Sequence, residues 1–167
     1  MSYSSIYTIT ELTSPLGPIT LISSEKGLSR LLFEPSRRSI QNFKAASIPF
    51  NMMKAENSYF AQQLIEYFEG RRKEFTIPLD LEGTSFRKKV WQALLSIPYG
   101  KTTSYGRIAN QIGNPKSSRA VGQACGANPV PIIVPCHRVL TSSGKMGGYS
   151  GGIHIKNALL KLEGVIL

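Results

Sequence analysis

The chain contains 167 residues, of which 41% are hydrophobic, so it can build a core in one large domain or two small ones. Its 20 basic and 10 acidic residues give a net charge of +10, which excludes an acidic disordered chain and favours a polyanionic partner. No apolar run reaches the roughly 18 residues of a membrane span, and the first residues show no signal-peptide pattern. We therefore expect a cytoplasmic or nucleoid-associated protein that is not a disulfide scaffold, since it has only two cysteines.

Three strands and one helix are predicted in the first half of the chain. Alternating apolar and polar residues, separated by turns rich in glycine and proline, place the strands around residues 7–9, 19–21 and 28–33. Apolar residues at i, i+3, i+4 and i+7 predict a helix over Asn57–Glu69, which Gly70 ends. The segment Phe75–Leu79 is expected to form a short strand or an extended connection.

The balance of charge changes abruptly at the segment Asp80–Thr84. Residues 1–84 contain nine basic and nine acidic side chains, whereas residues 85–167 contain eleven basic side chains and a single acidic one, Glu163. Because a solvated surface usually mixes both signs, a phosphate-binding face explains the second part better than an idle basic surface does. We therefore place a candidate domain boundary at this segment and predict a phosphate-binding face in the second part of the chain.

Four helices are predicted in the second half. They are expected to begin at Ser85, at Ser104, at Pro115–Ser117 and at Ile155, and to end near Pro98, Gly113, Ala124 and Gly164. The second and third helices are short and are joined by a tight turn in a basic context, which suggests a helix-turn-helix. The Ser/Gly-rich segment 141–152 is predicted to be a loop.

Cys136 and His137 are adjacent, directly after the apolar segment 132–134, and Arg138 follows them. A lone cysteine is usually a buried core residue, but a thiolate nucleophile needs a base or a positive field, and both stand beside Cys136. Neighbouring side chains of a regular strand point to opposite faces. The pair can therefore cooperate only if the chain bends there or a water molecule bridges the two side chains.

A histidine that acts as a base needs a third group to orient its ring. Glu163 is the only carboxylate after residue 84, and it stands near the C-terminal end of the last helix, where the helix dipole disfavours an anion. We therefore predict that Glu163 orients His137, with Asn128 or a carboxylate of the first half as the alternatives. No metal site is predicted, because the adjacent Cys136 and His137 do not match zinc-ligand spacing.

The sequence Pro-Cys-His-Arg-Val at 135–139 resembles the active-site motif of the methylated-DNA–protein-cysteine methyltransferases, the O6-alkylguanine-DNA repair proteins. Its context is also similar, in the segments 113–115, 119–122, 128–131 and 148–152. The resemblance is strong over residues 86–164 and weak over residues 1–84. It implies an α/β (α+β) fold in which an N-terminal ribonuclease-H-like three-stranded sheet with a helix precedes a C-terminal helical domain. Within the helical domain, a helix-turn-helix would carry the active-site cysteine. Residues 1–84 would accordingly form an N-terminal α/β support domain, and residues 85–167 a C-terminal DNA-binding and active-site domain.

The resemblance also implies a reaction. Cys136 would accept the alkyl group of O6-methylguanine in DNA, and also that of O4-methylthymine, in one irreversible turnover after the damaged nucleotide is flipped out. His137 would take the thiol proton through a water molecule, with Glu163 orienting its ring. Tyr105 would protonate or polarise the leaving guanine, and Asn128 would hold the turn before the active site.

The remaining implied roles concern DNA and the base pocket. Arg119 would fill the space left by the flipped base, and the other implied DNA-binding positions are Tyr105, Gly106, Asn114, Ser117 and Ser142. The implied lining of the guanine pocket is Val139, Tyr149 and Ser150. No cofactor is implied, and the expected partner is double-stranded DNA with O6-alkylguanine, bound by a monomer and away from membranes.

Two other functions compete with alkyl transfer. An alkyltransferase-like protein binds lesions without transfer and lacks the cysteine, so the presence of Cys136 beside His137 argues against it. A Cys/His hydrolase would share the nucleophile but would not need the basic second half. The sequence departs from the family at Cys125, which stands where several relatives carry a methionine. Some relatives also have zinc ligands near the N-terminus, but no cysteine or histidine precedes Cys125 in this sequence.

Overall fold

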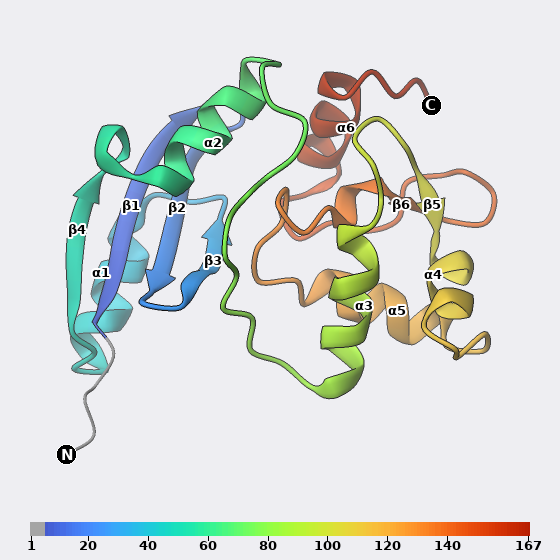
Figure 1. Cartoon of the computed structure of the whole chain (residues 1–167), viewed down its shortest axis with the longest axis horizontal. Helices are drawn as coiled ribbons and strands as arrows, with labels where there is room; N and C mark the ends of the chain where they lie inside the picture. The colour runs from blue at the N-terminus through green and yellow to red at the C-terminus, as the bar shows by residue number, and fades with distance from the viewer. Residues whose placement is uncertain (1–5) are drawn as a thin grey trace. The chain divides into compact units, whose positions relative to one another are not determined.

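The structure is a computed structural model that describes residues 6–167, which form two compact units that divide between Leu81 and Glu82 (Figure 1). The first five residues, on which the expectation of no signal peptide rests, lie outside the described residues. Within residues 6–167, no helix is long and apolar enough to cross a bilayer. The α+β architecture, with a sheet unit followed by a helical unit, confirms the predicted fold class.

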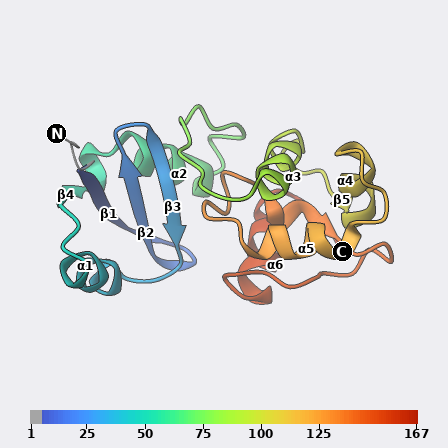
Figure 2. The same ribbon diagram turned by 90° about the horizontal axis from the view of Figure 1, so that it is seen from below.

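The N-terminal unit is built on a sheet with the strand order β3-β2-β1-β4. The three predicted strands are present as β1 (Tyr7–Ser14), β2 (Gly17–Ser24) and β3 (Gly27–Leu32), which pair antiparallel. The helices α1 and α2 lie on opposite faces of this sheet (Figures 1 and 2). Four consecutive residues of β2, from 19 to 22, are accordingly buried, because both faces of this strand are covered.

Two elements of this unit, a strand and a helix, were not predicted, and the strand makes the sheet four-stranded rather than three-stranded. The strand β4 (Phe50–Lys54) pairs parallel to β1, and all of its residues except the first are exposed, so it has no alternating pattern. The helix α1 (Ser36–Ala45) buries only two serines and therefore lacks an apolar stripe. Phe43 of α1 packs edge-to-face on the rings of Tyr7 and Phe50, at centroid distances of 5.4 and 5.8 Å.

The predicted helix of the first half is α2 (Tyr59–Phe68), with Ser58 as its N-cap. The segment Phe75–Leu79, predicted as a strand or an extended connection, lies beside the start of β3. There the Leu28 N–H donates to the Pro78 carbonyl at 2.9 Å. Gly27 precedes this contact with a φ of +148°, and a Cβ atom there would overlap the Pro78 carbonyl. Glycine is therefore required where the two backbones approach each other.

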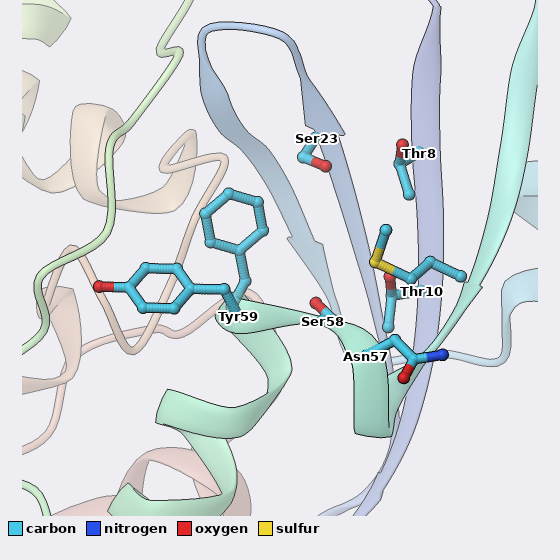
Figure 3. A pocket seen from close by; sticks show the side chains of 8 residues that line it. Thr8, Thr10, Ser23, Asn57, Ser58 and Tyr59 are labelled. Atoms are coloured by element: carbon cyan, nitrogen blue, oxygen red, sulfur yellow. The ribbon is translucent and has the colours of Figure 1, made fainter.

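A pocket of about 200 Å³ opens within the N-terminal unit (Figure 3). It is lined by Thr8, Thr10, Ser23, Met53, Asn57, Ser58, Tyr59 and Phe60. These side chains offer hydroxyl, amide and apolar surface but no carboxylate, imidazole, ammonium or thiol group. None of the site residues predicted from the sequence lies in this pocket.

The C-terminal unit contains four helices and a two-stranded parallel sheet. The helices are α3 (Ser85–Leu95), α4 (Tyr105–Gln111), α5 (Ser118–Gly126) and α6 (Ile153–Leu162), and the strands are β5 (Thr103–Ser104) and β6 (Val139–Leu140). The buried Trp91 of α3 donates its indole N–H to the carbonyl of Ala124 on α5 at 2.9 Å, which ties these two helices together.

Of the four helix starts predicted for this unit, those at Ser104 and Ser117 are correct, whereas α3 is capped one residue earlier than predicted and α6 begins at Ile153 rather than Ile155. Ser104 caps α4 by accepting from the backbone of Arg107, as predicted. The cap of α3 is Thr84 rather than Ser85, because the Thr84 side chain accepts from the backbone of Arg87. Ser117 occupies the N-cap position of α5, but its hydroxyl donates to the carbonyl of Asn114 at 2.7 Å and so stabilises the turn between α4 and α5 instead.

Candidate active site

The chain bends at Cys136, as it must if the adjacent side chains of Cys136 and His137 are to act together without a bridging water molecule. Cys136, His137 and Arg138 form a short 3-10 turn, so Cys136 and His137 are not on opposite faces of a strand. The side chains of all three residues are buried, and only 4% of Cys136 is exposed. A thiol at this depth can meet only a substrate group that enters the protein.

Asn128 fixes the approach to this turn. Its amide nitrogen donates to the Val134 carbonyl at 2.8 Å and to the Cys136 sulfur at 3.2 Å, and its oxygen accepts from the Val130 N–H at 3.0 Å. Between these contacts Ile132, a β-branched residue, has a φ of +75°, which is unfavourable for its side chain. Asn128 therefore holds a strained segment in place and sets the position of the thiol.

We expect Asn128→Ala to lower the free energy of unfolding by about 1–3 kcal/mol, because the buried Val130 N–H loses its acceptor. Urea denaturation would measure the change. Asn110→Ala is a matched control, since Asn110 is exposed on α4 and its loss should change the stability by about 0.5 kcal/mol or less. Equal stability of the two variants would contradict the role given to Asn128.

Burial raises the pKa of the Cys136 thiol to about 11, although the hydrogen bond from Asn128 and the positive charge of Lys156 oppose this rise. The thiol is therefore protonated at neutral pH, and a nearby base must remove its proton before the sulfur can attack. Lys156 is itself fully buried on α6 and donates to the Val139 carbonyl at 2.7 Å. Burial lowers the pKa of this lysine.

His137 and Glu163 form a buried pair, with 2.7 Å between the imidazole Nε2 and the carboxylate Oε1. Of the orienting groups considered from the sequence, Glu163 contacts His137, whereas Asn128 contacts the thiol instead. Because a carboxylate only accepts, Nε2 carries the proton of a neutral imidazole and Nδ1 is the basic atom. Among residues 6–167, Nδ1 has no hydrogen-bond partner, so it is available to accept a proton.

The surroundings of His137 favour its neutral form. Burial lowers the pKa of His137, and the positive charges of Arg138 and Lys156 lower it further. The hydrogen bond and the charge of Glu163 act in the opposite direction. A neutral imidazole oriented by a carboxylate is the arrangement of a general base.

Tyr105 begins α4 beside the two cysteines. Burial raises the pKa of its phenol to about 12, and the charges that Cys125 and Cys136 would carry as thiolates add to this rise. The ring lies against two glycines: a Cβ atom on Gly122 would sit 3.8 Å from it, and a Cβ atom on Gly147 would overlap the phenol oxygen. The phenol therefore stays protonated at neutral pH and can donate a hydrogen bond or a proton.

Comparison with known proteins identifies the family that has this arrangement. Residues 85–165 match the model of the 6-O-methylguanine DNA methyltransferase DNA-binding domain, and residues 4–81 match that of its ribonuclease-like domain. The chain belongs to this family. The expected relationship to the methylated-DNA–protein-cysteine methyltransferases is thereby confirmed.

Curated and structural relatives agree with this assignment. The methylated-DNA–protein-cysteine methyltransferase of Methanosarcina acetivorans is 48% identical over 153 residues, which cover 90% of this chain and 94% of that protein. The Mycobacterium tuberculosis OGT protein, crystallised in complex with DNA, superimposes with a TM-score of 0.81 at 46% identity and covers 93% of this chain and 92% of its own. The Pyrococcus kodakaraensis O6-methylguanine-DNA methyltransferase gives a TM-score of 0.68 at 28% identity, over 96% and 100% of the two chains.

In this 6-O-methylguanine DNA methyltransferase family member, the residues implied to contact DNA or line the base pocket have different exposures. Exposed side chains are found on α5, in the turn before it and in the loop 141–152, at Arg119, Asn114, Ser142 and Ser150. Half-buried positions are Gly106, Ser117 and Tyr149. Val139 is fully buried in β6, where its carbonyl accepts from Lys156.

Two buried cations were not predicted as site residues. Arg138 was noted only for its place after His137, and it contacts Glu163. Lys156 was not singled out, although it falls among the apolar residues Ile155, Leu159 and Leu160 of the last helix. A lysine in an apolar stripe is rarely buried without a partner, and this mismatch is the signal that could have found it.

Proposed function

We propose that this protein repairs alkylated DNA by moving the alkyl group from O6 of guanine to the sulfur of its own Cys136, once per molecule. The observation that carries this proposal is the buried thiol beside a histidine whose Nε2 contacts Glu163 and whose Nδ1 remains available as a base. O4-methylthymine, which carries its methyl group on an oxygen in the same way, is proposed as a second substrate.

The burial of Cys136 requires the substrate base to leave the duplex. An O6 atom inside the base stack cannot approach a thiol that is 4% exposed, so the nucleotide must be flipped into the protein. Flipping costs a few kcal/mol, and less for a damaged pair that stacks and pairs poorly. This difference favours the alkylated base over normal guanine.

The proposed chemical step uses the proton positions described above. His137 Nδ1 accepts the Cys136 proton through a water molecule, and Glu163 stabilises the imidazolium that forms. The sulfur attacks the alkyl carbon, so that a C–S bond forms as the C–O bond breaks and its electron pair goes to the guanine. Tyr105 donates its proton to the leaving guanine, which remains in the DNA as the normal base. The other product is a thioether on Cys136.

DNA binding is proposed for the helix-turn-helix formed by α4 and α5. The small residues Ser118, Ala120 and Gly122 near the start of α5 allow close approach to a DNA groove, and Arg119 projects from the same helix as an exposed cation. We propose that Arg119 fills the space of the flipped base. Contacts to the DNA backbone are proposed for Gly106, Asn114, Ser117 and Ser142, and the base pocket is proposed to include Val139, Tyr149 and Ser150.

Arg119→Ala is expected to slow repair of duplex DNA about tenfold or more, because the flipped state loses its space-filling side chain. The rate with free O6-benzylguanine should stay near that of the unmodified protein, since a free base needs no flipping. Lys161→Ala is the matched control, because it removes one exposed positive charge from α6. Equal losses with both substrates would argue against the proposed role of Arg119.

We further propose that the protein acts as a monomer in the cytoplasm or nucleoid. The nucleophile, its base and the orienting carboxylate all come from one chain, so a second copy is not needed to complete the site. Both cysteines are free, which fits a reducing compartment.

A further inference from the structure

We propose that Arg138 is a positioning residue that keeps His137 in its neutral, basic form by acting through Glu163. This inference rests on the proposed role of His137 as the base for Cys136. Arg138 does not contact the thiol or the substrate in this proposal. It fixes the orientation of the Glu163 carboxylate relative to the imidazole, and its positive charge offsets the negative charge of that carboxylate.

All three side-chain nitrogens of Arg138 donate hydrogen bonds inside the protein. Its Nε donates to Glu163 Oε2 and its Nη2 to Oε1, both at 2.9 Å, while Nη1 donates to the Ile97 carbonyl at 2.6 Å. The Arg138 side chain is 6% exposed and the Glu163 side chain is fully buried. This two-point contact fixes the plane of the carboxylate, as a lysine ammonium could not.

Two further groups contact the Glu163 carboxylate. The backbone N–H of Gly100 donates to Oε2 at 3.1 Å, and His137 Nε2 meets Oε1 at 2.7 Å. The carboxylate thus receives Arg138 and one further donor on each oxygen. With its plane fixed by Arg138, Oε1 presents a defined acceptor direction to the imidazole, which holds the ring with Nδ1 available.

Charge provides the second part of the argument. A buried carboxylate without a counter-ion would draw a second proton onto the imidazole, and Nδ1 would then be unable to accept the proton of Cys136. Arg138 balances the charge of Glu163, so the pair is neutral beside His137. The other ionisable groups near His137 and this pair are Lys156 of α6, the protonated Cys136 thiol, and Tyr99, whose ring lies 5.9 Å from the Arg138 guanidinium carbon.

Nuclear magnetic resonance can test this directly by following the titration of the ring nitrogens. The chain has only two histidines, and His154 is exposed on α6, so it serves as an internal reference. The titration is compared in the unmodified protein, Arg138→Met, Glu163→Gln and the double variant that carries both changes. In the unmodified protein we expect the His137 midpoint to lie below the usual range of a histidine, because burial lowers its pKa.

The expected changes follow from the net charge of the Arg138–Glu163 pair, which is zero in the unmodified protein, while Lys156 is the same in every variant. Arg138→Met leaves one negative charge, so the His137 midpoint should rise by about one pH unit or more. Glu163→Gln leaves one positive charge, so the midpoint should fall. The double variant is neutral again, and its midpoint should return towards that of the unmodified protein. A merely structural role of Arg138 does not produce opposite changes that cancel.

Reaction with free O6-benzylguanine gives a second readout. In Arg138→Met the acidic limb of the pH–rate profile should move to higher pH by the same amount as the His137 midpoint. A rise of one pH unit corresponds to a loss of up to about tenfold in the rate at pH 6.5, with recovery at higher pH. Arg138→Lys retains the charge but not the two-point contact. Its His137 midpoint should therefore stay near that of the unmodified protein while its rate falls at every pH.

The proposal is overturned if the His137 midpoint is the same in the unmodified protein and in Arg138→Met. If Arg138→Met does not fold, Glu163→Gln and the double variant decide, because they differ only in Arg138: equal midpoints would overturn the proposal. The titration does not depend on alkyl transfer. Failure of the proposed function, with no alkyl group appearing on Cys136, is therefore distinguishable from failure of this inference.

Discussion

Cys136→Ser should bind DNA that contains O6-methylguanine and transfer no methyl group from it. A serine hydroxyl is a far weaker nucleophile than a thiolate at neutral pH, and His137 cannot remove its proton to a comparable extent. The side chain is buried and nearly equal in size, so the fold and the DNA-binding face should be retained. Gel-shift binding and release of a radiolabelled methyl group from the DNA measure the two properties separately.

The unmodified protein should remove one methyl group per molecule and then stop. A thioether is a poor leaving group, and burial raises the pKa of the nearby Cys125 thiol to about 12, so that this thiol stays protonated and does not attack the alkyl group on Cys136. With excess substrate DNA, repaired guanine should therefore reach a plateau at one equivalent. Mass spectrometry of the digested protein should find the methyl group on the peptide that contains Cys136.

Cys125→Ser is the matched control for this experiment, because it changes the chain's other free, buried cysteine and leaves Cys136 in place. It should still accept one methyl group. Repeated turnover, or a methyl group on Cys125, would contradict the assignment of the acceptor. Binding without any transfer by the unmodified protein would instead support the lesion-binding alternative.

Glu163→Gln should slow alkyl transfer by on the order of 10²–10³-fold, because His137 loses the charge that stabilises its imidazolium. It should also lower the free energy of unfolding by about 3–5 kcal/mol, since Arg138 becomes a buried cation without a counter-ion. The affinity for DNA should change little, because Glu163 is buried and does not face the phosphates. Single-turnover rates, urea denaturation and gel-shift titration measure these three effects.

Glu82→Gln removes the same charge from an exposed position and should change none of the three quantities appreciably. If Glu163→Gln transfers the methyl group at the normal rate, the carboxylate contact is not needed for catalysis. Orientation of His137 would then have to come from a different group.

Much of this structure follows from local sequence patterns. The strands β1 to β3 and the helix α2 were predicted because periodicity and turn residues act over a few neighbouring positions. The same holds for Ser104 as the cap of α4. The charge difference between the two halves and the Cys136–His137 pair are likewise visible without coordinates, because they depend on composition and adjacency alone.

Elements without a local signal were missed for a physical reason. The strand β4 is exposed along most of its length. It forms because its backbone pairs with β1, which lies about forty residues earlier in the chain. The helix α1 has no apolar stripe and depends on the contacts of Phe43 with Tyr7 and Phe50. In both cases tertiary contacts decide the structure, and neither periodicity nor propensity records them.

The sequence alone was enough to propose Cys136 as the nucleophile, His137 as its base and Glu163 as the carboxylate that orients the ring, because these proposals depend on residue type, adjacency and the scarcity of acidic residues after residue 84. The contacts among these residues arise only in the folded chain. Glu163 reaches His137 across 26 positions, Arg138 reaches Ile97 across 41, and Gly100 reaches Glu163 across 63. Spacing of this size carries no geometric information, because the intervening chain can fold in many ways. These residues form a buried network because folding removes them from water, and a buried charged or polar group is stable only when a protein group replaces the lost water as its hydrogen-bond partner.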